Sequence, residues 1–146
     1  MSLTSDALLE AMQTFPLHRQ FGFTITSHGD GLCEAACTID SAHRNFGGVV
    51  HGGVMYLLLD VTAYCAAVTI LPADTNATTH DIHVSMMRPT PAGAQLVLRA
   101  AVRKRGRSLY FIDSEATSNG QLVASARITK SLVPLPAGSF QGGAQP

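Results

Sequence analysis

Hydrophobic residues follow two different periods along this chain. Between residues 51 and 70 they run almost without interruption, and Pro72 follows, so we expect one long and largely buried helix that the proline ends. From residue 77 onward apolar and polar residues alternate, which predicts strands with one buried face. The alternation stops at Arg105–Arg107 and at Ser118–Gly120, which are typical of turns. We therefore expect a four-stranded antiparallel meander after the helix, with strands near 77–88, 96–102, 110–116 and 122–133.

Shorter elements come before the long helix. They are, in order, a helix over 3–13 that ends before Pro16, strands over 21–27 and 31–39 with a hairpin turn at Gly29–Gly31, and a polar loop over 41–50. Six strands and one long helix predict an α+β domain over residues 1–134. Residues 135–146 are rich in Pro, Gly, Ala and Gln, and we expect them to form an irregular tail.

Composition adds an expectation about assembly and location. Charged residues make up 14% of the chain, where about 25% is usual, so part of the surface is expected to be buried against other copies. The most apolar stretch, Val54–Leu59, is cut by Asp60 and is far shorter than the roughly 20 residues of a membrane span. The first residues lack the pattern of a secretory signal. We expect a cytoplasmic homo-oligomer that does not bind a membrane.

Neither a metal site nor a cofactor is expected. The three cysteines, Cys33, Cys37 and Cys65, are odd in number and lack CxxC spacing, which favours reduced, apolar residues over a zinc site. His80 and His83 are three residues apart on a predicted strand, so their side chains point to opposite faces and do not easily share one ion.

Charge is unevenly distributed, although its sum is zero. Residues 1–87 carry eight acidic and two basic side chains (−6), and residues 88–146 carry two acidic and eight basic ones (+6). Two interpretations are open: the basic half binds a phosphate-bearing ligand, or the halves neutralise each other in the fold. A nucleic acid is disfavoured because the basic residues are interleaved with apolar strand positions and no aromatic series accompanies them.

The long helix contains two features that suit chemistry. Gly52 and Gly53 open it, where backbone amides lack partners within the helix and the dipole favours negative charge. Asn45 and His51 add polar groups beside them. Asp60 lies in mid-helix among apolar residues, where a carboxylate is costly unless it is paired, and such a group suits a nucleophile or a general base. Close packing at the glycines and a structural Asp60 are the alternatives.

The turn around Gly106 is basic. Folding the hairpin about this glycine places Arg99 near Asp113, so we expect Arg99 to form a cross-strand pair. Arg105 and Arg107 remain free to meet phosphates, or they form a solvated turn.

The stretch Asn-x-x-Gly-x-x-His-Gly-Gly over residues 45–53, with Asp60 nine residues after the histidine, resembles the hotdog-fold acyl-CoA thioesterases of the phenylacetate-degradation (PaaI-like) type. Weaker similarities lie at 79–89, 105–108 and 119–124, and the resemblance covers residues 20 to 134. It implies a hotdog fold, in which a curved antiparallel sheet wraps one long helix. It also implies hydrolysis of a thioester to a free acid and coenzyme A, by dimers that often pair into tetramers.

The resemblance also implies roles for single residues. Asp60 is the nucleophile or the base that activates water, and the Gly52 N–H polarises the thioester carbonyl. Asn45 and His51 hold that region and contact substrate or water. Thr79 matches a hydroxyl position near the water, with His80 as the rival. Because alternation places Thr79 on the face opposite Ile82 and Val84, a β-bulge or a partner subunit must bring it in.

Binding residues follow in the same way. Those expected to meet coenzyme A are Arg88, Arg105, Arg107 and Ser108, and those expected to line the acyl pocket are Gly53, Tyr56, Leu57 and Tyr64. The function expected is therefore that of an acyl-CoA thioesterase without a metal. The alternative is a non-catalytic protein that binds acyl-CoA or acyl carrier protein on the same fold. The signatures of the dehydratase and hydratase branches of this fold are not present.

The expected roles need two chains. Gly52 and Asp60 are eight residues apart, about 12 Å along one helix, yet the thioester carbonyl must lie about 3 Å from both the attacking group and the polarising N–H. Two helices packed antiparallel across a two-fold axis bring Gly52 of one beside Asp60 of the other. We therefore expect a homodimer as the smallest active unit, within a homotetramer.

Overall fold

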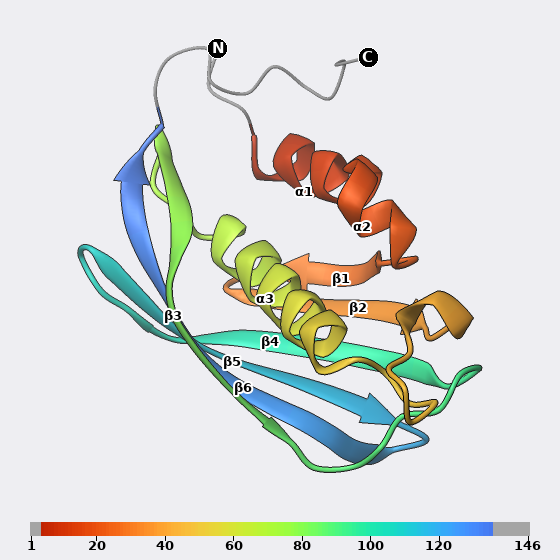
Figure 1. The fold of residues 1–146 in the computed structure, drawn as a ribbon. Coiled ribbons are helices and arrows are strands. Elements are labelled where there is room, and N and C mark those ends of the chain that lie inside the picture. The colour runs from red at the N-terminus through yellow and green to blue at the C-terminus, as the bar shows by residue number, and fades with distance from the viewer. Residues whose placement is uncertain (1–3, 136–146) are drawn as a thin grey trace.

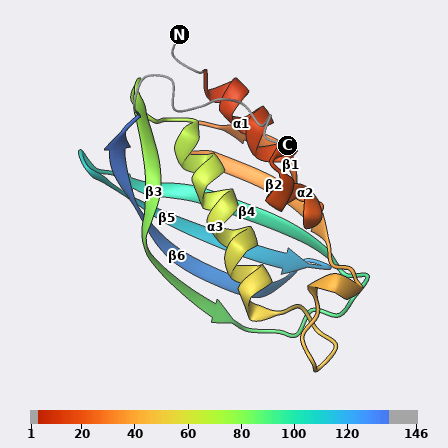
Figure 2. The same cartoon turned by 45° about the horizontal axis from the view of Figure 1, so that its top comes forward.

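One antiparallel sheet curves around one long helix, as Figures 1 and 2 show. The computed structural model describes residues 4–135. The helix, α3 (Gly52–Val68), lies along the inner face of the sheet. The strands are β1 (Thr24–Gly29), β2 (Leu32–Thr38), β3 (Thr75–Met86), β4 (Gln95–Arg105), β5 (Leu109–Ser118) and β6 (Gln121–Pro134). This is the α+β architecture that the sequence predicts.

The order of the strands differs from the predicted meander. It is β1-β2-β4-β5-β6-β3, so only β4, β5 and β6 follow one another, and the prediction is wrong for β3, which pairs with β6 at the edge. The reason is that α3 crosses the sheet between β2 and β3. The chain between β3 and β4 then returns to the other side, where Gly93 N–H donates to Ile39 O at 2.7 Å and Ile39 N–H to Ala94 O at 2.9 Å.

One stripe of α3 is uncovered. Most of the helix packs on the sheet, and Met55, Leu58 and Leu59 are fully buried. A few of its residues remain exposed or half-buried, and they include Gly53, Tyr56, Leu57, Asp60 and Tyr64. The prediction of a buried helix therefore holds for every side but one. Because these residues recur at three- and four-residue spacing, they form one continuous face.

The N-terminal segment forms two short helices, α1 (Ser5–Thr14) and α2 (Pro16–Gln20). Pro16 ends α1 as predicted, but it also takes the first position of α2, where a missing N–H costs nothing, and the sequence analysis did not predict this second helix. The β1–β2 hairpin turns at Asp30 and Gly31, which both have positive φ, as a tight hairpin requires. A short 3-10 helix, η1 (Ser41–His43), lies in the predicted loop.

Some expectations concern membrane segments, metal sites and the C-terminal tail. Within residues 4–135 no helix is long and apolar enough to cross a membrane. In that same range the three cysteines are free and buried, and no group of three or more His, Cys, Asp or Glu side chains is placed to hold a metal ion. The predicted tail lies outside the described residues except for Leu135.

Candidate active site

The Asp60 carboxylate is held by two side chains from neighbouring strands. The Lys130 ammonium, on β6, donates to Asp60 Oδ1 at 2.6 Å. The Thr79 hydroxyl, on β3, lies 2.9 Å from Oδ1 and 3.1 Å from Oδ2, and it accepts from Lys130 Nζ at 2.7 Å. The Asp60 side chain is 32% exposed and that of Lys130 is 2% exposed. A carboxylate that solvent can reach is thus fixed by a buried cation.

A β-bulge places Thr79 in this cluster. The register between β3 and β6 shifts between Thr79 and Asp81, so His80 is an extra residue on β3 and the alternation of side chains reverses there. The ring Nδ1 of His80 lies 3.2 Å from Ser131 Oγ, and it is Thr79 that contacts Asp60. The bulge is one of the two arrangements that the sequence analysis required for Thr79.

The start of α3 is capped by the residue before it. His51 is the N-cap, and its ring Nδ1 accepts a hydrogen bond from Gly53 N–H at 2.9 Å. A Cβ on Gly53 would come within 3.1 Å of this nitrogen, so a glycine there lets the ring approach the backbone. Gly52 is the first helical residue, so its N–H has no partner within the helix. A Cβ on Gly52 would meet no atom within 4 Å, which shows that the space beside it is open.

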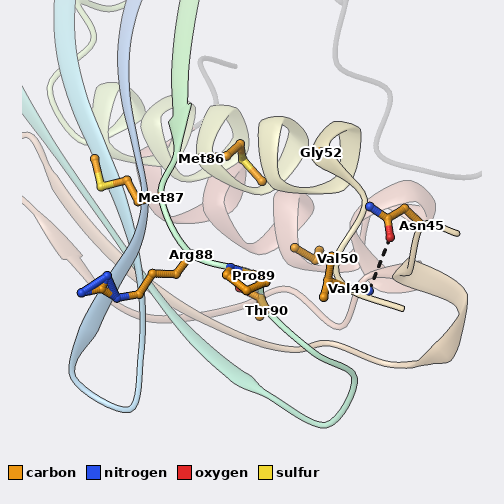
Figure 3. Close-up of a pocket in the computed structure, with 9 residues that line it drawn as sticks. All are labelled: Asn45, Val49, Val50, Gly52, Met86, Met87, Arg88, Pro89 and Thr90. Carbon is orange, nitrogen blue, oxygen red and sulfur yellow. Dashed lines mark hydrogen bonds between the residues drawn. The ribbon is translucent and has the colours of Figure 1, made fainter. Parts of the chain in front are cut away.

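A cavity of about 400 Å³ lies beside this helix start (Figure 3). It is lined by Asn45, Val49, Val50, Gly52, Met86, Met87, Arg88, Pro89 and Thr90. Asn45 Oδ1 accepts from Gly47 N–H at 2.8 Å and from Val49 N–H at 3.4 Å, which closes the loop that forms one wall. Thr90 is buried, and its hydroxyl has no hydrogen-bond partner among residues 4–135. The cavity therefore combines an apolar lining with polar groups from Gly52, Arg88 and Thr90.

Within one chain, the Asp60 cluster and the cavity at the start of α3 lie apart. Asp60 does not line the cavity, and it lies about 12 Å along α3 from Gly52. Each chain thus carries the Asp60 carboxylate with its two partners at the middle of α3 and a cavity beside the Gly52 N–H at its start.

The sequence matches the thioesterase superfamily over residues 47–125, which run from the loop before α3 into β6. The chain belongs to this superfamily.

Individual relatives agree with this membership. Human acyl-coenzyme A thioesterase 13 is 27% identical over 141 residues, which cover 90% of this chain and 99% of the human protein. Among solved structures, the phenylacetic acid degradation-related protein of Ralstonia eutropha JMP134 is 26% identical with a TM-score of 0.80, over 90% of this chain and 100% of that one. Protein PA5202 of Pseudomonas aeruginosa is 26% identical with a TM-score of 0.78, over 84% and 97%. The predictions of a hotdog fold, a PaaI-like relationship and a thioester hydrolase are confirmed.

The residues predicted to bind coenzyme A fall at two places in this thioesterase. Arg88 lines the cavity at the start of α3. Arg105, Arg107 and Ser108 lie at the β4–β5 turn, near the other end of the helix. Tyr110 ties the turn there, since its hydroxyl donates to Ile70 O at 3.1 Å and accepts from Arg105 Nε at 3.0 Å. One chain therefore does not bring the predicted phosphate contacts together.

The predicted pair of Arg99 and Asp113 is wrong. Arg99 lies opposite Glu115 because the turn joins Arg105 to Tyr110 and the register then shifts between Val102 and Lys104. The Arg99 Nε donates to Glu34 at 2.7 Å. Asp113 instead binds Arg103 at 2.9 Å and Arg127 at 2.6 Å. The pairs Glu34–Arg99 and Asp60–Lys130 each join an acidic residue of the first half of the chain to a basic residue of the second half. They favour the interpretation that the two halves neutralise each other in the fold.

The residues predicted for the acyl pocket all lie on the uncovered stripe of α3. Tyr56 is 40% exposed, Gly53 is exposed and Leu57 is half-buried. The Tyr64 hydroxyl donates to Asn76 Oδ1 at 2.7 Å, and burial raises the pKa of Tyr64 to about 12. None of the four lines the cavity of the same chain. They would surround a ligand only if a second molecule covered this stripe.

Sequence reasoning missed two polar groups of this site. Lys130 shares the inward face of β6 with Ala126 and Ile128, so a lysine in phase with buried residues was a readable signal. Thr90 follows an Arg-Pro turn, and no pattern in the sequence distinguishes it from other turn residues.

Proposed function

We propose that this protein is an acyl-CoA thioesterase in which Asp60 is the nucleophile or general base and the Gly52 N–H polarises the thioester carbonyl. The observation that carries the proposal is the Asp60 carboxylate, which lies on the uncovered stripe of α3 with fixed partners on one side and solvent on the other. Asn45 and His51 act by holding the loop and the helix start that present Gly52. Residues 1–134 form the catalytic domain, and the enzyme needs neither a metal nor a cofactor.

Either role of Asp60 gives the same products. As a nucleophile, a carboxylate oxygen attacks the carbonyl carbon, the C–S bond breaks, and water hydrolyses the resulting anhydride. As a general base, the carboxylate takes a proton from water, whose oxygen attacks the carbon, and the proton passes to the leaving sulfur. In both routes the net change is that one C–S bond is replaced by one C–O bond, and the products are a free acid and coenzyme A. In both, an N–H at a helix start stabilises the oxyanion.

The site requires a second chain. Gly52 and Asp60 of one chain do not meet, and the uncovered stripe of α3 offers the surface on which a second α3 would pack antiparallel. That arrangement puts the partner's helix start toward the C-terminal half of α3, the end at which the β4–β5 turn lies. It would bring Leu57 and Tyr64 toward the partner's cavity and the basic turn toward the same substrate. We infer a cytoplasmic homodimer as the active unit, within a homotetramer.

The proposed hydrolysis is tested by incubating the protein with a panel of aromatic and aliphatic acyl-CoA esters and detecting the free thiol. We expect release of coenzyme A at a rate proportional to enzyme concentration. The competing function is a non-catalytic protein that binds acyl-CoA or acyl carrier protein. Stoichiometric binding of the esters without release of thiol would establish it.

The basic turn gives a prediction about binding. Replacing Arg105 and Arg107 together by alanine should raise KM more than it lowers kcat, because a phosphate contact far from the carbonyl is similar in the ground and transition states. Initial rates against acyl-CoA concentration measure both constants. Arg99→Ala is the matched control, since Arg99 is also exposed but binds Glu34. An unchanged KM in the double variant would favour the alternative interpretation, in which these two residues form a solvated turn and do not contact phosphate.

A further inference from the structure

Lys130 is a buried cation on β6, the strand next to the edge strand β3. Its side chain is 2% exposed, and its Cα pairs with that of Thr79 on one side and Tyr110 on the other. The only other lysine in the sequence, Lys104, is exposed. Burying an ammonium group is costly unless its donors are all used, so the surroundings of Lys130 must account for it.

The donors of Lys130 converge on the site. Nζ lies 2.6 Å from Asp60 Oδ1 and 2.7 Å from Thr79 Oγ1, and it lies 5.7 Å from the centre of the Tyr64 ring. The ionisable groups around it are Asp60, Tyr64 and Cys65 on α3 and Tyr110 on β5. Desolvation lowers the pKa of Lys130, while the charge of Asp60 and its hydrogen bond act in the opposite direction. Asp60 is the one carboxylate that compensates this cation within the described residues.

Stability alone does not explain the pair. A buried ion pair is often no more stabilising than apolar residues of similar volume, and the neighbours of Lys130 on the inward face, Ile128 and Ala126, are apolar. The pair does have a geometric effect on the carboxylate itself. The 2.6 Å contact with Lys130 holds Asp60 Oδ1 at a fixed place on the inner face of the sheet.

The two carboxylate oxygens of Asp60 are not equivalent. Oδ1 is contacted by Lys130 at 2.6 Å and by Thr79 at 2.9 Å, whereas Oδ2 has only the Thr79 contact at 3.1 Å. The Thr79 hydroxyl accepts from Lys130 and so directs its single proton to the carboxylate. Lys130 and Thr79 therefore anchor one oxygen and leave lone pairs of the other available.

From this geometry we propose that Lys130 is a positioning residue for thioester hydrolysis, which holds Oδ1 of Asp60 in place and so presents Oδ2 to the substrate or to water. The proposal rests on the proposed role of Asp60. It assigns the buried lysine to the reaction, through a residue that touches the reacting atoms, and adds a requirement for positive charge behind the carboxylate.

The test replaces Lys130 by methionine, which has a similar volume and no charge, with Lys104→Met as the matched control. We expect Lys130→Met to lower kcat by a factor on the order of 10–10³ with little change in KM. A lysine that served only the stability of the fold would not lower kcat selectively in a folded variant. Lys104→Met should reproduce the wild-type kcat and KM. Circular dichroism and the thermal midpoint verify that each variant is folded.

A conservative variant separates charge from packing. Lys130→Arg retains the positive charge and N–H donors for Asp60, so it should keep more of the wild-type kcat than Lys130→Met does. An equal loss of kcat in the methionine and arginine variants would overturn the proposal, as would a Lys130→Met enzyme with wild-type kcat. If Asp60→Asn abolishes hydrolysis while Lys130→Met does not affect it, the lysine inference alone fails. If Asp60→Asn stays active, the proposed function and the lysine inference both fail.

Discussion

Replacing Asp60 by asparagine should reduce thioester hydrolysis by a factor on the order of 10²–10⁴ while acyl-CoA binding persists. Asparagine has nearly the same size and can still accept a hydrogen bond from Lys130, but it can neither attack a carbonyl as an anion nor take a proton from water. Single-substrate kinetics with the best ester of the panel measure kcat. Calorimetric titration with a non-hydrolysable analogue measures binding.

The matched control for this variant is Asp30→Asn. Asp30 lies in the β1–β2 turn with φ near 50°, a conformation that asparagine also adopts readily, so the same chemical change is made at a residue that does not contact Asp60, Thr79 or Lys130. Hydrolysis by Asp60→Asn within about threefold of the wild-type rate, a difference of less than about 1 kcal/mol in the barrier, would remove Asp60 from the mechanism.

Two inactive variants should restore activity to each other when their subunits mix. Asp60→Asn removes the carboxylate, and Gly52→Pro removes the N–H. The structure favours proline at this place, because it is the first position of α3 and because His51 before it has φ −65° and ψ 136°, which is the conformation that precedes proline. A mixed dimer would contain one site with an intact Gly52 and Asp60 and one site without either.

The measurement is the rate of hydrolysis after the variants have been mixed under conditions where labelled subunits are seen to exchange. Random mixing of equal amounts gives mixed dimers with one working site each, so about a quarter of the wild-type activity per chain should return by the symmetry of the dimer. Gly52→Ala retains the N–H and meets no atom within 4 Å, so it should lose far less activity than Gly52→Pro. Exchange without recovery would show that each site is built within a single chain.

The sequence was most informative where the pattern was local. The apolar run before Pro72 predicted α3, and alternation predicted the strands, because burial on one side of a helix or strand leaves its period in the chain. The place of β3 was not predicted, since strand order depends on how α3 crosses the sheet. The predicted cross-strand pair of Arg99 with Asp113 was wrong because the position of the turn sets the register of the hairpin. A displacement of the register by one residue changes every pair along the two strands.

The candidate site was predicted in part for the same reason. Gly52 and Asp60 lie in one helix, so their separation could be calculated from the sequence. Thr79 came from a resemblance, and alternation alone placed it on the wrong face because a bulge leaves no clear mark in the sequence. Lys130 was missed although it stands in phase with buried residues, since nothing local shows that the carboxylate 70 residues earlier is its partner.

The edge position of β3 also determines the stage of folding at which the cluster around Asp60 can form. Asp60, Thr79 and Lys130 meet only after β3 has paired with β6, which closes a loop of about 50 residues between Thr79 and Lys130. Such pairings of high contact order form slowly. A chain that folds from its N-terminus during synthesis holds Asp60 on α3 without its cation until β6 has been added. The surroundings of the Asp60 carboxylate are therefore completed by β6, the last of the six described strands to be made.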